Sequence, residues 1–259
     1  MGNLALLVVA TFISIANSPY AQVAILQAMV LFGALACATY LFVGRPDQRW
    51  YGGRAVAESI KTLTWRYVSR AEPFDQTNAI DRHQFGLKLR AIIEQNREVS
   101  SLLTSHLAAE QIAPELDLLR NASTDSRLDF YRVHRIVEQQ TWYAKKASLN
   151  SRMVKRFFIA LIVTISIAMF FAIAKIKYPT APFWPTDLFV TGAAGLLSWI
   201  QAKRFQELSA SYTLTAHEIS LIRQAASGPM TDAELSRFVG DAENAFSREH
   251  TQWVARKDG

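Results

Sequence analysis

Side chains able to do chemistry are few in this chain, and their spacing fits no catalytic or metal-binding pattern. None of the five histidines has a second His, Cys or acid at a convincing metal-ligand spacing. His217 and Glu218 begin like a zinc-protease motif, but position 221 is Leu. The sequence has no phosphate-binding glycine loop and no Gly-x-Ser-x-Gly motif, and its single cysteine, Cys37, lies in an apolar block. We therefore expect no enzyme, no catalytic residue, no cofactor and no metal site.

The charged and aromatic residues instead form two stripes at helical spacing. On a helix, residues three or four positions apart share one face. The first stripe consists of Trp50, Arg54, Ala57, Glu58, Lys61 and Trp65. The second consists of Tyr131, Arg135, Gln139, Trp142, Lys146 and Asn150. We interpret both as candidate seams that register or gate cytoplasmic helices, with Glu58 and Arg135 as candidate partners, and a solvated face is the alternative.

Each stripe has an apolar side opposite to it. Behind the second stripe this side consists of Phe130, Val133, Val137, Ala144 and Ala147. Behind the first it consists of Val56, Ile60, Leu63 and Tyr67. We expect the apolar side of the second stripe to pack against the protein's own helices.

The elements that must position these stripes are anchored by four apolar blocks. The longest uncharged run, residues 157–174, would extend about 27 Å as a helix, close to the hydrocarbon thickness of a bilayer. The four blocks predict transmembrane helices at about 3–17, 23–43, 157–175 and 186–201. Because short turns join them in pairs, we expect an all-α integral membrane protein with two transmembrane hairpins and long cytoplasmic helices that form a bundle.

The polar segments between the spans are also predicted to be helical. Helices are expected at about 49–70, 80–109, 205–226 and 231–256, the last opened by a capping box at Thr231 and Glu234. A long helix beginning near Ser126 should continue into the third span. This pattern predicts three parts: residues 1–78 with the first hairpin, an insert at 79–125, and residues 126–259 with the second hairpin.

The distribution of basic residues predicts the orientation. Residues 45–156 contain 19 Lys or Arg, whereas the turn at 17–22 contains none and the loop at 175–187 contains two. Basic residues favour the cytoplasmic side, so both termini are expected there. The net charge of +6 comes from basic residues interleaved with acids, which argues against a specific nucleic-acid interface.

Within the spans we looked for polar or small residues that could pack helices or line a pore. These are Gln27, Thr164, Ser166, Thr191, Gly192, Gly195 and Ser198. Hydroxyls in helices commonly bond their own backbone, so packing is the alternative to pore lining. Apart from Lys175 and Asp187 at their ends, the spans contain no charged residue, which argues against an ion-coupled transporter.

Taken together, these motifs resemble the SLATT family, the SMODS- and SLOG-associating two-transmembrane effectors of bacterial conflict systems. The second stripe, directly before a hairpin, is similar to one variety of the family, and the first stripe, directly after a hairpin, is similar to another. A tail motif adds to the likeness: Arg248, Glu249, His250, Trp253 and Arg256. The resemblance therefore covers nearly the whole chain as two fused hairpin units.

The resemblance implies a function that composition does not reveal. It implies an anti-phage effector in the bacterial inner membrane that oligomerises and permeabilises or depolarises the membrane when triggered. Its expected partners are the lipid bilayer, further copies of the chain, and a sensor protein or a nucleotide second messenger. The alternative is a membrane-anchored interaction module that recruits a cytosolic sensor or enzyme. Nucleotide binding through Arg54, Lys61, Arg135 and Lys146 also stays open.

Overall fold

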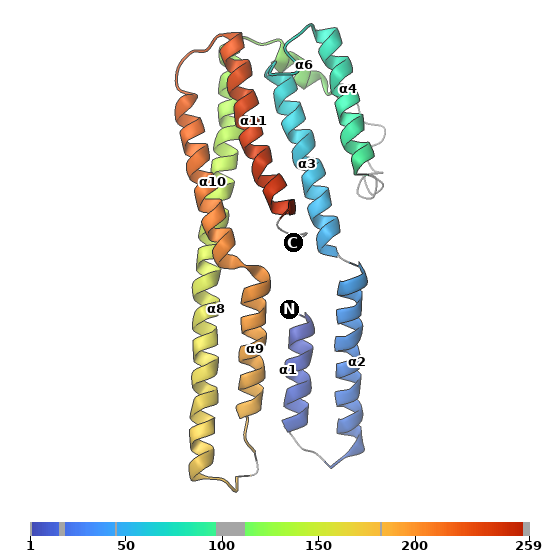
Figure 1. The fold of residues 1–259 in the computed structure, drawn as a ribbon, viewed down its shortest axis with the longest axis vertical. Helices are drawn as coiled ribbons and strands as arrows, with labels where there is room; N and C mark the ends of the chain where they lie inside the picture. Colours follow the sequence, from blue (N-terminus) through green and yellow to red (C-terminus); the bar gives the residue numbers. More distant parts are fainter. Residues whose placement is uncertain (1, 16–18, 45, 97–111, 182, 256–259) are drawn as a thin grey trace. The chain divides into compact units, whose positions relative to one another are not determined.

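The computed structural model describes residues 2–15, 19–44, 46–96, 112–181 and 183–255, apart from the side chains of 46–49, 51 and 248–255. In these ranges every regular element is a helix, which confirms the all-α class (Figure 1). The chain divides into two compact units. Residues 1–45 and 145–213 form what we call the apolar unit, and residues 46–144 and 214–259 form the body unit. Each unit therefore combines pieces from both halves of the sequence.

The apolar unit consists of two helical pairs. Helix α1 (Gly2–Ile15) pairs with α2 (Ala21–Gly44), and the later part of α8 (Glu138–Lys177) pairs with α9 (Thr186–Lys203). Helix α1 packs against both α2 and α9. The rings of Phe171 and Phe189 stack at 5.7 Å and join α8 to α9.

Among the residues that the structure describes, two helices are long and apolar enough to cross a membrane. They are α2 and the continuous 54-residue helix Thr124–Lys177, whose last part is α8. Only 6% of the most apolar window of each is buried, whereas the core helix of a soluble protein would be mostly covered. This exposure indicates a membrane protein. Helix α1 is apolar but has only 14 residues, and α9 is less apolar than the two candidate spans. The arrangement with four spans therefore stays a prediction.

The body unit is built around α3 (Pro46–Val68). This helix packs against α4 (Asn78–Gln95), α6 (Pro114–Arg120) and α11 (Asp232–Ala255). The unit also contains α7 (Thr124–Tyr131), the π-helix η2 (Arg132–Val137), the start of α8 and most of α10 (Phe205–Ala225). The rings of Tyr67, Phe74 and Phe85 meet at 5.1–6.1 Å in a buried core that fixes α4 against the end of α3.

Local signals set most helix ends close to their predicted positions. The capping box is confirmed, because the Thr231 backbone N–H donates to Glu234 at 2.8 Å and the Glu234 N–H donates to Thr231 Oγ1 at 3.3 Å. The hydroxyl of Ser123 caps α7 by accepting a hydrogen bond from the Ser126 backbone N–H. Helix α4 ends at Gln95, and most of the predicted remainder to residue 109 lies outside the described residues.

The prediction of which side of the long helix is covered is wrong. Phe130 and Val133 are 39% and 55% exposed, and Ala144 is exposed as well. The polar stripe is the buried side instead: Tyr131, Arg135, Gln139 and Asn150 are all at most 9% exposed. The reason is chemical, because α3 and α11 present hydroxyl and carboxylate groups that satisfy the charged side of the helix.

Candidate functional site

A buried charge cluster joins four elements of the body unit, α3, the last residue of α7, η2 and α11. Glu243 on α11 and Arg135 on η2 are 0% and 1% exposed. The Arg135 Nε and Nη2 atoms donate to the two Glu243 carboxylate oxygens at 2.8 and 2.7 Å. Tyr131 Oη donates to Oε1 at 2.9 Å, and Thr62 Oγ1 on α3 donates to Oε2 at 2.7 Å. Glu58 of α3 stands 3.6 Å from Arg135 Nη1. We call these five residues the Arg135–Glu243 cluster.

The surroundings of the cluster shift the pKa values of Arg135 and Tyr131. Burial lowers the pKa of Arg135, but the hydrogen bonds to Glu243 and the charge of Glu243 outweigh it, so that the pKa is raised. Burial, followed by the charge of Glu243, raises the pKa of Tyr131 well above its usual value, so its phenol stays a donor. A two-pronged guanidinium–carboxylate pair tolerates little change of register. The cluster therefore fixes the position of η2 against α3 and α11.

The cluster lies on an irregular part of the long helix. Arg135 belongs to the six-residue π-helix Arg132–Val137, which leads without a break into α8. Such wide turns inside α-helices are rare and occur frequently at functional sites. Aromatic side chains surround this turn, because the Trp65 ring lies 5.5 Å from Tyr131 and 5.8 Å from Phe130. A return of this segment to regular α geometry would move every later residue of the helix.

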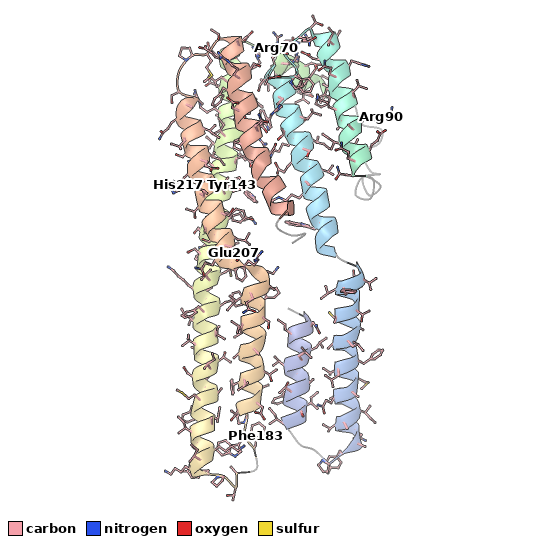
Figure 2. The ribbon with its side chains drawn as sticks, viewed as in Figure 1. Arg70, Arg90, Tyr143, Phe183, Glu207 and His217 are labelled. Carbon is pink, nitrogen blue, oxygen red and sulfur yellow. The ribbon has the colours of Figure 1, made fainter. Side chains whose placement is uncertain are left out.

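The two predicted seams meet within one chain. Besides Glu58 with Arg135 and Trp65 with Tyr131, the Arg54 guanidinium carbon lies 4.6 Å from the Trp142 ring centroid and 5.8 Å from that of Trp50. The Lys61 ammonium stands 3.5 Å from Glu138 in a mostly exposed pair. Tyr143, which follows Trp142 of the second stripe, is labelled in Figure 2. Its side chain is buried, with 2% of its surface exposed.

Sequence reasoning missed Glu243. It stands on the apolar side of α11, among buried residues at 235, 239, 242 and 246. A single acid within an apolar stripe was the signal that could have found it, because such a carboxylate needs a partner. The predicted tail motif lies outside the part of the chain that the structure describes. This holds for the side chains of Arg248, Glu249, His250 and Trp253 and for the whole of Arg256.

A second buried ion pair, also missed, holds the end of α3. Arg120 and Asp81 are both 0% exposed and are paired. Arg120 also donates to the backbone oxygens of Tyr67 and Phe74 and to Asn78 Oδ1. Burial lowers the pKa of Arg120. Since Arg120 bonds both to these carbonyls and to the side chains of Asn78 and Asp81, the pair holds α4 and the loop before it against the end of α3.

The body unit also has an open pocket of about 540 Å³ between α3, the loop after it and α11. Its charged lining consists of Arg66, Arg70, Arg237, Glu72, Asp75, Asp232 and Asp241. Three cations face four acids, so the pocket favours neither an anion nor a strong cation. Within the described residues, no group of His, Cys, Asp or Glu is arranged to hold a metal ion.

The polar residues of the predicted spans mostly bond within the apolar unit. Thr164 and Ser198 donate to the backbone oxygens four residues earlier, at 2.7 and 2.8 Å. Gln27 donates to the Ala10 oxygen at 3.5 Å and ties α2 to α1. These bonds agree with the packing alternative for these three side chains.

The other span candidates differ in what surrounds them. A Cβ added at Gly192 would lie 3.8 Å from Thr164 Cγ2, an ordinary contact distance, so Gly192 faces α8 with room for a methyl group and no more. A Cβ added at Gly195 would meet no atom within 4 Å. Thr191 is half-buried and Ser166 is exposed.

Two family models together account for most of the chain. The model described as SMODS and SLOG-associating 2TM effector domain 3 matches residues 1–128, and the model for domain 1 of the same series matches residues 131–253. The chain belongs to the SLATT family. SLATT effector domains are associated with conflict systems, and they are membrane-type domains rather than known enzymes. No curated protein and no solved structure matches the chain.

The two SLATT matches meet at the Arg135–Glu243 cluster. Glu58 and Thr62 come from the residues matched by domain 3, and Tyr131, Arg135 and Glu243 come from the residues matched by domain 1. The cluster is therefore a junction between the two SLATT segments of one chain.

Proposed function

We propose that this SLATT protein is a four-span effector of the bacterial inner membrane that oligomerises and permeabilises the membrane when triggered. Helices α1 and α9 would complete two hairpins with α2 and α8, and both termini would lie on the cytoplasmic side. At 1.5 Å per residue α1 reaches about 21 Å, so the bilayer would thin locally around it. The apolar contact of α1 with both α2 and α9 supports its place among the spans.

The observation that supports oligomerisation is a set of exposed apolar side chains on the body unit, of which Leu214 and Leu221 stand seven residues apart on one face of α10. Val133 on η2 is 55% exposed, and Leu214 and Leu221 on α10 are 63% and 66% exposed. These residues lie outside the predicted spans, so lipid would not cover them. Apolar patches of this kind mark contact sites. Contact between copies of the chain would bury them.

A pore would have to form between subunits. Four helices of one chain are too few to enclose a wide water-filled path, and the hydroxyls of Thr164 and Ser198 already bond their own helices. The Arg135–Glu243 cluster would hold α3, η2 and α11 in the resting arrangement. Shifting the π-helix by one residue would turn the following helix by about 100° and move it about 1.5 Å. A trigger that shifts the packing of α3, η2 and α11 would in this way change the surface that α8 offers to a neighbouring subunit.

The test is membrane potential in single cells after induced expression, during phage challenge, for the intact protein, Leu221→Glu and the control Gln224→Glu. Both changes add a carboxylate to an exposed position of α10, but only Leu221 belongs to the apolar surface. We expect the intact protein and the control to depolarise cells and to form oligomers in native mass spectrometry, and Leu221→Glu to do neither. Depolarisation by a strictly monomeric protein, or none under any challenge, would contradict the proposal.

The second candidate function is a membrane-anchored module that recruits a cytosolic sensor or enzyme. It is favoured by the self-satisfied polar groups of the spans, which suit an anchor as well as a pore. Replacing the four spans with an unrelated anchor separates the two functions, because retained protection against phage would favour recruitment.

A nucleotide second messenger is a third partner to test, by calorimetry of the full chain with cyclic oligonucleotides. Arg135 is unsuited to contact it in this state, being 1% exposed and engaged by Glu243.

A further inference from the structure

Charge in the apolar unit is confined to a few positions and is mostly positive. Residues 2–44 contain no charged side chain, whereas residues 145–213 contain nine Lys or Arg and only two acids, Asp187 and Glu207. Five of the cations lie at one end of the apolar segments of α8 and α9. We call these residues the basic belt: Arg152, Lys155, Arg156, Lys203 and Arg204.

The basic belt is exposed and almost unpaired. All five side chains are exposed. Among the described residues, Arg152, Lys155 and Arg156 have no ion-pair partner, and Arg204 pairs with Glu207 at 3.1 Å. Their positive charge is therefore available to an outside anion.

The fold brings the two parts of the belt close together. The Phe157 ring, next to Arg156, stacks on the Phe205 ring, next to Arg204, at 5.4 Å and 9°. Arg204 turns the chain from α9 into α10 with a left-handed backbone, φ 48°. That conformation is uncommon for a residue other than glycine. It separates the end of α9 from α10 and exposes the cations at the corner.

The depth of the belt matches the phosphate layer of a membrane. Counted from Phe157, where the apolar segment of α8 begins, Arg156, Lys155 and Arg152 stand about 1.5, 3 and 7.5 Å outward. Lys203 stands about 4.5 Å beyond Ile200, the end of the apolar segment of α9. The headgroup layer on each side of a bilayer is about 5–8 Å thick.

We propose that the basic belt binds the headgroups of anionic phospholipids in preference to zwitterionic ones. This inference rests on the membrane location in the proposed function but not on pore formation. Arg side chains match phosphate oxygens with paired donors, and long basic side chains reach from the helix surface to the headgroups. Lys203, whose ammonium lies 4.8 Å from the Trp199 ring, stands beside the kind of residue that anchors at this interface.

The experiment measures which lipid the purified full chain retains in non-ionic detergent. The protein is captured, equilibrated with equal amounts of phosphatidylglycerol and phosphatidylcholine of the same acyl chains, and the bound lipids are extracted and quantified. Each exposed cation at an anionic surface strengthens association by roughly fivefold. We expect phosphatidylglycerol to be enriched at least about fivefold on the intact protein, and added salt to reduce this ratio.

Matched pairs of substitutions test the location. Lys203→Gln with Arg204→Asn, where Asn tolerates the left-handed backbone, should lower the ratio by roughly fivefold or more. Lys175→Gln with Lys177→Gln removes the same charge from the other end of α8 and should leave the ratio within about twofold. Monodisperse elution of each variant shows that it is folded.

Several results would overturn the inference. A ratio near one on the intact protein, unaffected by salt, removes it without any variant. Equal loss in both paired variants would mean a general charge effect with no site. If soluble glycerol phosphate displaced the lipid at equal concentration, the ligand would be a free phosphate and not a membrane. Loss of depolarisation with the lipid ratio intact would count against the proposed function alone.

Discussion

Replacing Glu243 with Gln should destabilise the protein more than any surface change. The carboxylate accepts hydrogen bonds from Arg135 Nε and Nη2, Tyr131 and Thr62 at 2.7–2.9 Å. A neutral amide has one oxygen for these donors, and its NH₂ group would face the guanidinium. Removing one partner of a buried ion pair costs about 3–5 kcal/mol. Glu58, 3.6 Å from Arg135 and one quarter exposed, compensates in part, so we expect a value near the lower end, about 3 kcal/mol.

The assay is thermal unfolding of the detergent-solubilised full chain followed by intrinsic fluorescence. For a chain of this size about 1 kcal/mol corresponds to about 2–4 °C, so Glu243→Gln should lower the melting temperature by about 6–12 °C. The matched control is Lys61→Met, which breaks the 3.5 Å exposed pair with Glu138. It should lower the melting temperature by less than about 3 °C, because exposed pairs contribute little.

A double-mutant cycle decides whether the effect belongs to the pair. Arg135→Met alone leaves Glu243 buried without its main partner, whereas the double variant removes both charges together. We expect the double variant to lose at least about 1.5 kcal/mol less than the sum of the single losses. A fall of under about 2 °C for Glu243→Gln, or strictly additive losses, would refute the reasoning that buried charge couples η2 to α11.

Three further outcomes follow from other contacts. Gly192→Leu should lower the melting temperature by the equivalent of about 1–3 kcal/mol, because the larger side chain would collide with α8. Gly195→Leu should not lower it, because a side chain there meets no atom within 4 Å. Equal effects of the two substitutions would contradict this geometry. Arg120→Met should destabilise by about 3–5 kcal/mol in chemical unfolding because it leaves a buried carboxylate unpaired, and a loss below about 1 kcal/mol would mean that the carboxylate is not charged. Burial and the hydrogen bond to Asp117 raise the pKa of Tyr67 from 10.0 to about 12. Its contribution should therefore be complete below pH 10 and disappear as the pH rises through about 12, and in unfolding measured against pH Tyr67→Phe should flatten this alkaline decline; an unchanged slope would assign the decline to other groups.

Helix positions could be predicted from the sequence because their causes are local. The helix expected at about 49–70 is α3 at Pro46–Val68, and the one expected at 205–226 is α10 at Phe205–Ala225. Proline, glycine and capping residues act within a few positions of themselves, so their effects can be read in the sequence. No such local signal predicted the π-helix, which contains Arg135 and its contact with the distant Glu243.

The seam residues were recognised as a stripe and the predicted pair of Glu58 with Arg135 is confirmed, but the main partner of Arg135 was not foreseen. Helical periodicity shows that Tyr131, Arg135 and Gln139 share a side, and it would show the same for an exposed or a buried stripe. Apolar residues are usually buried, and that rule led to the wrong side here, since Val133 is 55% exposed. Glu243, 108 positions from Arg135, was missed for the same reason.

The sequence by itself determined the all-helical class, the SLATT family and the two charged stripes, because each depends on residue types at short, regular spacing. Only the tertiary structure decided that the stripes meet inside one chain, that Glu243 closes the cluster, and that an apolar side of the body unit stays uncovered. The physical reason is that a buried charge is stable only beside its partner. Which partner that is depends on how α3, η2 and α11 pack, and no spacing within a single helix carries that information.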